Sequence, residues 1–150
     1  MEIWELVARE SVRDLVQRYN ANGDSGRFDP LLELFAEDAS MEIKGHIYRG
    51  HGEIREIFEG AARGTGTQQG QKASFIRHFT STHQIDVISK NELRGRCYYA
   101  VLTDHGLDHW GRYVDEYRKV DGEWRFWKRK VTVDAGVPDG WSQSPPTTST

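Results

Sequence analysis

Apolar residues recur at spacings of mostly three to five near the start of the chain. This period predicts an amphipathic helix over about residues 2–21. Asn22-Gly23 then predicts the helix stop, because both residues tolerate a left-handed backbone. The apolar stripe consists of Ile3, Val7, Val12, Leu15, Val16 and Tyr19.

Three shorter patterns follow this helix. Asp29-Pro30 is typical of an N-cap followed by a first-turn proline, and it predicts a short helix through residues 31–35. Apolar positions within 41–47 indicate a first strand. A third helix is expected over about 52–62, and the Gly/Thr/Gln stretch at 64–70 predicts a mobile loop.

The second half of the chain is dominated by β-branched and aromatic residues, in four runs divided by turn residues. Asp121-Gly122 between the last two runs is a favoured hairpin turn. The pattern predicts an antiparallel meander of four long strands. These strands are expected near 75–88, 93–104, 108–120 and 123–134.

Helices followed by a long meander predict an α+β fold, a cone-shaped α+β barrel with three N-terminal helices packed on a curved, mainly antiparallel mixed sheet. The helices cannot fill the whole cone, so we expect a ligand cavity between the first helix and the sheet. This domain is predicted to cover residues 1–136. Residues 137–150 have little to bury and are expected to form a flexible tail.

Composition narrows the class of protein. The 150 residues carry a net charge of −3, which argues against a general nucleic-acid binder. Cys97 is the single cysteine, so no intrachain disulfide can form and a reducing cytoplasm fits best. No signal peptide and no membrane-spanning apolar run is visible. We therefore expect a cytoplasmic protein without membrane or nucleic-acid partners.

Four segments resemble the SnoaL-like branch of the nuclear transport factor 2-like superfamily, and the resemblance covers about residues 2–134. It implies the same cone-shaped fold. The superfamily includes isomerases, cyclases, hydrolases and members without known catalysis, so the resemblance alone does not imply one reaction. The four segments are Glu10–Asp24, Leu34–Ala39, Tyr48–Ile54 and Val120–Phe126.

Within that branch, the catalytic resemblance is to scytalone dehydratase, bile-acid 7α-dehydratase and hexachlorocyclohexane dehydrochlorinase. These enzymes carry an aspartate just after the first helix and a histidine on the first meander strand, places that Asp24 and His78 match. Tyr19 matches a tyrosine of the bile-acid dehydratase, and Arg129 matches an arginine of the dehydrochlorinase. The dehydrochlorinase has a lysine near the Tyr19 position, so its chloride-eliminating specificity is not carried over.

Asp24 and His78 make chemical sense as a catalytic pair. A carboxylate bonded to one imidazole nitrogen fixes the tautomer, so the other nitrogen becomes a base. The alternative is a solvated loop carboxylate and a half-buried strand histidine without catalytic roles. His83 is a rival base, but it lies an odd number of residues from His78, so in a regular strand it should face outward or lie at a subunit contact.

Tyr19 and Arg129 are predicted to stabilise an oxyanion or hold a leaving group. The alternatives are a core tyrosine and an arginine in the charge alternation of an exposed strand. His105 and His109, with Asp104 and Asp108 nearby, are read as a polar hairpin turn. Their spacing does not match a metal motif, so we expect neither a metal nor a cofactor.

Aromatic residues are frequent on the predicted meander, and some are expected to line the cavity. They favour a flat, ring-containing apolar ligand. The convex face of the sheet should be covered in a homodimer or homotrimer. The residues predicted to bind substrate are Tyr98, Trp110, Tyr113 and Trp127.

The leading hypothesis is a cofactor-independent lyase of the dehydratase type, or an isomerase, that acts on such a ligand through an Asp–His general base. The first alternative is a non-catalytic small-molecule-binding protein of the same fold. The second is an interaction protein that uses the fold only to dimerise. The presence of Asp24 together with His78 separates the first hypothesis from the other two, because binding does not require an oriented base.

Overall fold

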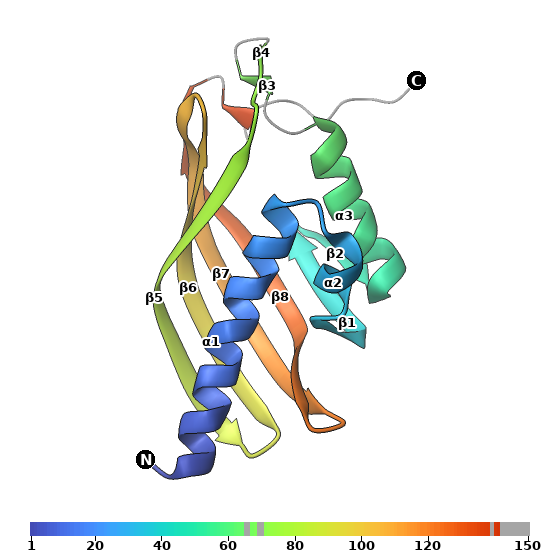
Figure 1. The fold of residues 1–150 in the computed structure, drawn as a ribbon, viewed down its shortest axis with the longest axis vertical. Coiled ribbons are helices and arrows are strands. Elements are labelled where there is room, and N and C mark those ends of the chain that lie inside the picture. Colours follow the sequence, from blue (N-terminus) through green and yellow to red (C-terminus); the bar gives the residue numbers. More distant parts are fainter. Residues whose placement is uncertain (65–66, 69–70, 139, 142–150) are drawn as a thin grey trace.

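A computed structural model describes residues 1–64, 67–68, 71–138 and 140–141. One six-stranded sheet curves around helix α1, and α2 and α3 lie beside its β1–β2 edge (Figure 1). The fold is α+β, as predicted. The helices are α1 (Ile3–Asp24), α2 (Phe28–Leu32) and α3 (Gly50–Gly64). The strands are β1 (Phe35–Ile43), β2 (His46–Arg49), β3 (Thr67–Gln68), β4 (Gln71–Lys72), β5 (Ile76–Ser89), β6 (Glu92–Thr103), β7 (Gly106–Val120) and β8 (Glu123–Gly136).

The large sheet has the strand order β2-β1-β8-β7-β6-β5. Strands β5 to β8 form the predicted antiparallel meander. Strand β1 pairs with β8 in parallel and with β2 in antiparallel, so the sheet is mixed. The meander strands begin and end within two residues of the predicted positions, because their turn residues are explicit in the sequence.

The first half of the chain differs from the prediction in three elements. Helix α1 continues through Asn22 and Gly23 to Asp24, and the first residue after it with a positive φ is Gly26, at 71°. The short second helix ends at Leu32, and Phe35 already opens β1. The expected single strand is a hairpin of β1 and β2, because Lys44 and Gly45 adopt the left-handed backbone of a tight turn.

The predicted loop at 64–70 contains strand β3, which pairs with β4 in a short hairpin. Residues 65–66 and 69–70 of that prediction lie outside the described residues. In the predicted tail, the Val137 backbone N–H donates to the Asp108 carbonyl and the Trp141 backbone N–H to the Asp108 carboxylate. Residues 139 and 142–150 lie outside the description.

One face of α1 forms the core with the concave face of the sheet. Val12 and Val16 are fully buried, and the Tyr19 ring packs edge-on against the Phe126 ring at 5.7 Å between centroids. Burial of these side chains is the main stabilisation of the helix–sheet packing. Across the described residues, no helix is long and apolar enough to cross a lipid bilayer.

Candidate active site

Asp24 and His78 are in direct contact. Asp24 is the last residue of α1, and His78 lies near the start of β5, where the two elements meet. The Asp24 Oδ1 atom lies 2.6 Å from His78 Nδ1, and Asp24 Oδ2 accepts the backbone N–H of His78 at 2.8 Å. The carboxylate thus holds both the ring and the backbone of the histidine. The predicted contact between these two residues is present.

This contact determines the hydrogen-bonding state of the His78 ring. Only 9% of the Asp24 side chain and 20% of the His78 side chain are exposed, so water competes weakly for the bond. A carboxylate oxygen can only accept, so Nδ1 carries the hydrogen. In the neutral imidazole, Nε2 then has its lone pair available as a base.

His83 also faces inward, contrary to the prediction. A β-bulge interrupts the β5–β6 register between Ser81 and Gln84, and Thr82 has a φ of 54°. The extra residue reverses the side-chain alternation of the strand. His83 Nε2 therefore lies 3.3 Å from the Tyr117 hydroxyl on β7, and burial lowers the pKa of His83.

Arg129 lies in the core, on β8. Its Nε and Nη2 atoms donate to the two Asp115 oxygens at 2.8 and 2.9 Å, and neither side chain of this pair is exposed. Burial works against its charge, yet Asp115 raises the pKa of Arg129 above the ordinary value. Nη1 has no hydrogen-bond partner among the described residues. The alternative of an arginine on an exposed strand is therefore wrong, because Arg129 faces the helix side of the strand.

Tyr19 lies against this arginine. The Arg129 guanidinium carbon is 4.2 Å from the Tyr19 ring centroid and 3.9 Å from that of Tyr113. Burial raises the pKa of Tyr19 to about 12, against the opposing influence of Arg129, so the hydroxyl keeps its proton. The structure thus brings Tyr19, Tyr113 and Arg129 together in one buried cluster.

Three of the four predicted substrate-binding residues point away from this interior. Tyr98 is 55% exposed between the buried Cys97 and Tyr99, so it lies on the convex face. Trp110 pairs with Ala100 on the same face. The prediction for both residues is wrong. Side chains alternate between the two faces of a strand, and the sequence alone does not show which set faces the core.

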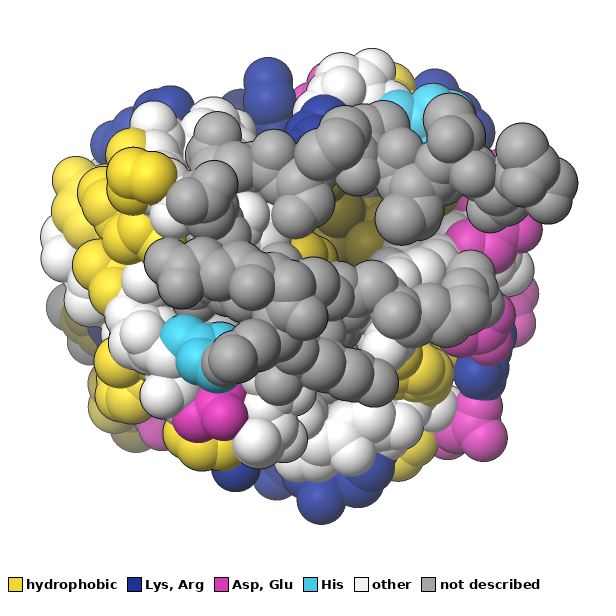
Figure 2. All heavy atoms as spheres, turned by 90° about the horizontal axis from the view of Figure 1, so that it is seen from above, with side chains coloured by type: hydrophobic (Ala, Val, Ile, Leu, Met, Phe, Trp, Pro, Cys, Tyr) yellow, Lys and Arg dark blue, Asp and Glu magenta, His cyan; other side chains and the backbone are white. Residues whose placement is uncertain are grey.

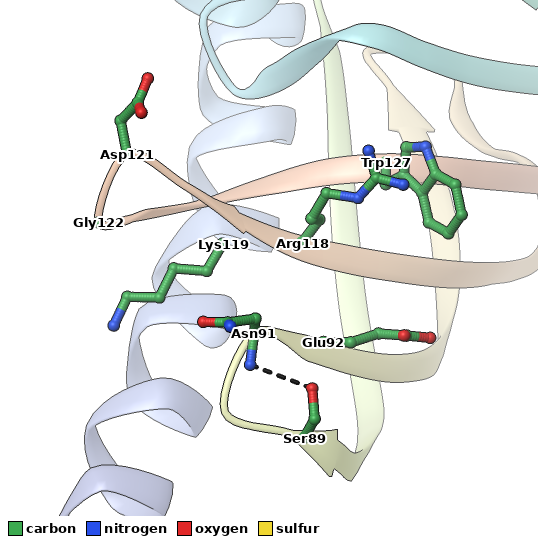
Figure 3. A pocket seen from close by; sticks show the side chains of 8 residues that line it. All are labelled: Ser89, Asn91, Glu92, Arg118, Lys119, Asp121, Gly122 and Trp127. Carbon is green, nitrogen blue, oxygen red and sulfur yellow. Dashed lines mark hydrogen bonds between the residues drawn. The ribbon is translucent and has the colours of Figure 1, made fainter.

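Trp127 lines a different feature, at the opposite end of the sheet. A surface cleft of about 650 Å³ lies beside the β5–β6 and β7–β8 turns. Figure 3 shows the residues that line it, Trp127 among them. The Arg118 guanidinium lies over the Trp127 ring, 3.7 Å from its centroid. None of Asp24, His78 and Tyr19 lines this cleft, so we separate it from the candidate active site.

Figure 2 looks from above onto the end of the molecule that lies uppermost in Figure 1, and it shows a hollow with hydrophobic side chains in its depth. Strand β5 begins towards this end. Phe58 of α3 packs edge-on against Tyr19 at 5.8 Å between centroids, and Phe28 lies 6.1 Å from Phe58. The Phe28 and Phe58 rings and the Ile76 side chain are only partly buried. Ile76 precedes His78 by two residues on β5 and lies on the same face of the strand, which places apolar surface beside the Asp24–His78 pair.

Sequence reasoning missed two residues on the face of the sheet that carries His78. The Tyr99 ring on β6 lies 6.1 Å from the His78 ring and stacks on Tyr113 at 4.6 Å. The His109 ring on β7 lies 6.0 Å from Tyr99 and is buried rather than part of a rim turn. The odd-numbered alternation of Cys97, Tyr99 and Val101 on β6 is a signal that could have found Tyr99, whereas no comparable signal marks His109 on β7.

A metal site is not indicated by the described part of the chain. Within it, no group of three or more His, Cys, Asp or Glu side chains is arranged to hold a metal ion. The Asp24–His78 and Asp108–His109 contacts each join one imidazole ring to one carboxylate. In each contact the carboxylate orients the imidazole, and the second ring nitrogen can accept a proton.

Comparisons with known proteins give one family and one fold. The family model of the SnoaL-like domain matches residues 4–130. A protein from Novosphingobium aromaticivorans DSM 12444 with the provisional name scytalone dehydratase is 22% identical, with 100% of this chain and 99% of that chain covered and a TM-score of 0.75. None of the curated proteins is a significant match.

Two further solved structures share the fold. Hexachlorocyclohexane dehydrochlorinase LinA-type3 from Novosphingobium barchaimii LL02 is 17% identical, with 92% and 94% of the two chains covered and a TM-score of 0.77. A protein of unknown function with a cystatin-like fold from Nostoc punctiforme PCC 73102 is 22% identical, with 87% and 93% covered and a TM-score of 0.75. At these identities the likeness shows the fold alone.

Proposed function

This chain belongs to the SnoaL-like domain family, and we propose that it is a cofactor-independent lyase or isomerase. In this proposal His78, held by Asp24, removes a proton from an apolar, ring-containing small molecule bound in the hollow. The bond that then breaks or shifts lies next to the carbon that loses the proton. The dehydratase and the dehydrochlorinase of similar fold carry the names of lyases, which supports this class of reaction.

The observation that carries the proposal is the double contact between Asp24 and His78. A binding protein needs polar groups to orient its ligand, but it does not need an imidazole whose tautomer is held by a carboxylate. General-base catalysis by such a group is typically worth about 10²–10⁴-fold in rate. Asp24 also stabilises the imidazolium that forms when Nε2 takes the proton.

Tyr19 and Arg129 keep their predicted roles within this proposal. Tyr19 remains protonated at neutral pH, so its hydroxyl can donate to an oxygen on which negative charge develops. Arg129 stacks on the Tyr19 ring and brings a positive charge into the buried cluster. Its Nη1 atom, which has no hydrogen-bond partner among the described residues, is the donor that we assign to the developing charge, directly or through Tyr19.

The experiment is proton exchange into D₂O on a panel of ring ketones that includes 1-tetralone, followed by mass spectrometry. This assay detects the base without knowledge of the bond that is finally broken. We expect the protein to accelerate exchange at the carbon next to the carbonyl, and His78→Gln to lower the acceleration by about 10²–10⁴-fold. His105→Gln, at the β6–β7 turn, is the matched control and should behave as the wild type.

The alternative function gives a different result in the same assay. A non-catalytic binding protein of this fold would bind the ketones, as calorimetry would show, without accelerating exchange above the buffer rate. Exchange that is equally fast in wild type and His78→Gln would refute the role of His78.

A further inference from the structure

A second imidazole lies on the same wall as His78. In the sheet register His78 pairs with Val101, and Val101 pairs with His109. Directly paired residues share a face of the sheet, so both imidazoles project to the concave side, two strand spacings or about 10 Å apart. The Tyr99 ring lies between them, 6.1 Å from His78 and 6.0 Å from His109.

His109 is held as firmly as His78, by different residues. The Asp108 Oδ2 atom lies 2.6 Å from His109 Nδ1, and Asp108 Oδ1 accepts the Trp141 backbone N–H at 2.9 Å. The Trp141 ring packs edge-on against the imidazole at 5.4 Å between centroids. Asp108 is fully buried, so water does not compete for its oxygens.

These contacts determine what His109 offers to a ligand. Nδ1 donates to the carboxylate, so Nε2 carries the lone pair in the neutral ring. Burial lowers the pKa of His109, against the opposing influence of Asp108, which keeps the ring neutral at pH 7. Among the described residues, Nε2 of His109 has no hydrogen-bond partner. Because Nε2 of the neutral His109 ring carries no proton, it cannot protonate a leaving group. It can accept a hydrogen bond from a hydroxyl group that remains on the ligand.

We propose that His109 is a specificity-determining residue whose Nε2 accepts a hydrogen bond from a hydroxyl group of the ligand. The ligand class narrows accordingly to hydroxylated ring compounds, with the hydroxyl on the side of the molecule away from the carbon at which His78 acts. This inference rests on the proposed function for the hollow as the binding site, but it does not require turnover.

The test compares two probes that differ by one hydrogen-bond donor, 2-naphthol and its methyl ether, 2-methoxynaphthalene. Affinities are measured by calorimetry on the full chain. We expect wild type to bind the naphthol about tenfold more tightly, since one hydrogen bond to a buried acceptor is worth that much. His109→Phe should bind both probes equally and keep its affinity for the ether. His105→Phe, the matched control, should keep the preference.

One further measurement makes the outcome decisive. Replacing His109 leaves the buried Asp108 carboxylate without its ring partner, so nitrogen NMR of the wild-type histidines provides a test without substitution. The His109 Nε2 resonance should move on addition of 2-naphthol and stay in place with the ether. Equal affinities in wild type, no binding of either probe, or a preference that survives His109→Phe would overturn the inference.

The two proposals fail separately. His78→Gln should lose proton exchange but retain the preference for 2-naphthol. A preserved preference without any exchange in wild type would remove the catalytic role of His78 and leave the role of His109 in place.

Discussion

Replacing Asp24 by asparagine tests the central geometry with a change of one atom. Two N–H donors face the carboxylate, the backbone N–H of His78 at 2.8 Å and the ring Nδ1–H at 2.6 Å. An amide has one acceptor oxygen and one NH₂ donor, so it cannot serve both. The backbone N–H cannot change its character, whereas the imidazole can move its hydrogen to Nε2. We therefore expect Asp24→Asn to give the tautomer in which Nε2 is protonated.

The expected decrease in exchange rate follows from the loss of the lone pair on Nε2 of His78. The rate of proton exchange should fall by about 10²–10⁴-fold, the usual contribution of a general base. Stability should change little, because the amide still makes two hydrogen bonds and loses only their charge assistance. The free energy of unfolding should fall by about 1–2 kcal/mol.

The assay combines the exchange reaction with nitrogen NMR of the His78 ring and urea unfolding. Asp14→Asn is the matched control, because Asp14 lies on the same helix and pairs with Arg18 at 2.6 Å in an exposed contact. This control should keep the exchange rate and lose at most about 0.5 kcal/mol. A His78 ring that retains hydrogen on Nδ1 in Asp24→Asn, or an unchanged exchange rate, would contradict the reasoning.

Three further results are expected. Asp115→Asn should lower the free energy of unfolding in urea by about 3–5 kcal/mol, because it leaves Arg129 buried and charged without its carboxylate partner. The control Asp38→Asn removes an exposed pair with Arg118 and should lower that free energy by less than about 1 kcal/mol, so equal losses in the two variants would contradict this. Burial lowers the pKa of His83 below its ordinary 6.5, so on acidification the unfolded chain binds that proton before the folded chain does. As the pH decreases through about 6.5 the melting temperature should therefore decrease, less steeply in His83→Gln than in wild type; identical slopes of melting temperature against pH would refute this. We also propose that a second copy of the chain covers the convex face, so sedimentation should show a homodimer or homotrimer that Phe79→Lys weakens, and a monomeric wild type would reject it.

Strand positions in the meander are predictable from the sequence because turn residues and β-branched runs are local signals. The face on which each side chain lies is a non-local property. Tyr98 and Tyr99 are neighbours with the same propensity, and only the pairing of β6 with β5 and β7 turns Tyr99 inward. The predicted set of pocket residues therefore contained the wrong tyrosine of this pair.

The Asp24–His78 pair could be predicted because the family resemblance placed both residues at the same end of the fold. Asp108 and His109 could not, since adjacent polar residues near a glycine are typical of a turn. Their burial depends on Trp141, which lies 32 positions after His109 and packs over its ring. A tail with little apolar content gave no signal of this contact.

The bulge at Thr82 explains why one strand can serve two separate polar sites. A β-branched residue with positive φ is strained, so the surrounding contacts must stabilise it. Without the extra residue, His78 and His83 would face opposite sides of β5 and only one could reach the interior. With it, His78 meets Asp24 at the hollow, while His83 reaches the Tyr117 hydroxyl, which donates to Asp115 at 2.9 Å.

The second site holds the charged pair of the core. Asp115 accepts hydrogen bonds from the Tyr117 hydroxyl and from Nε and Nη2 of Arg129. His83 is therefore connected, through Tyr117 and Asp115, to the guanidinium that lies against the Tyr19 ring. Removing the bulge residue would therefore detach His83 from this network, although His78 itself would stay in place. It follows that one irregularity of β5 connects the strand that carries the base to the groups proposed to stabilise developing charge.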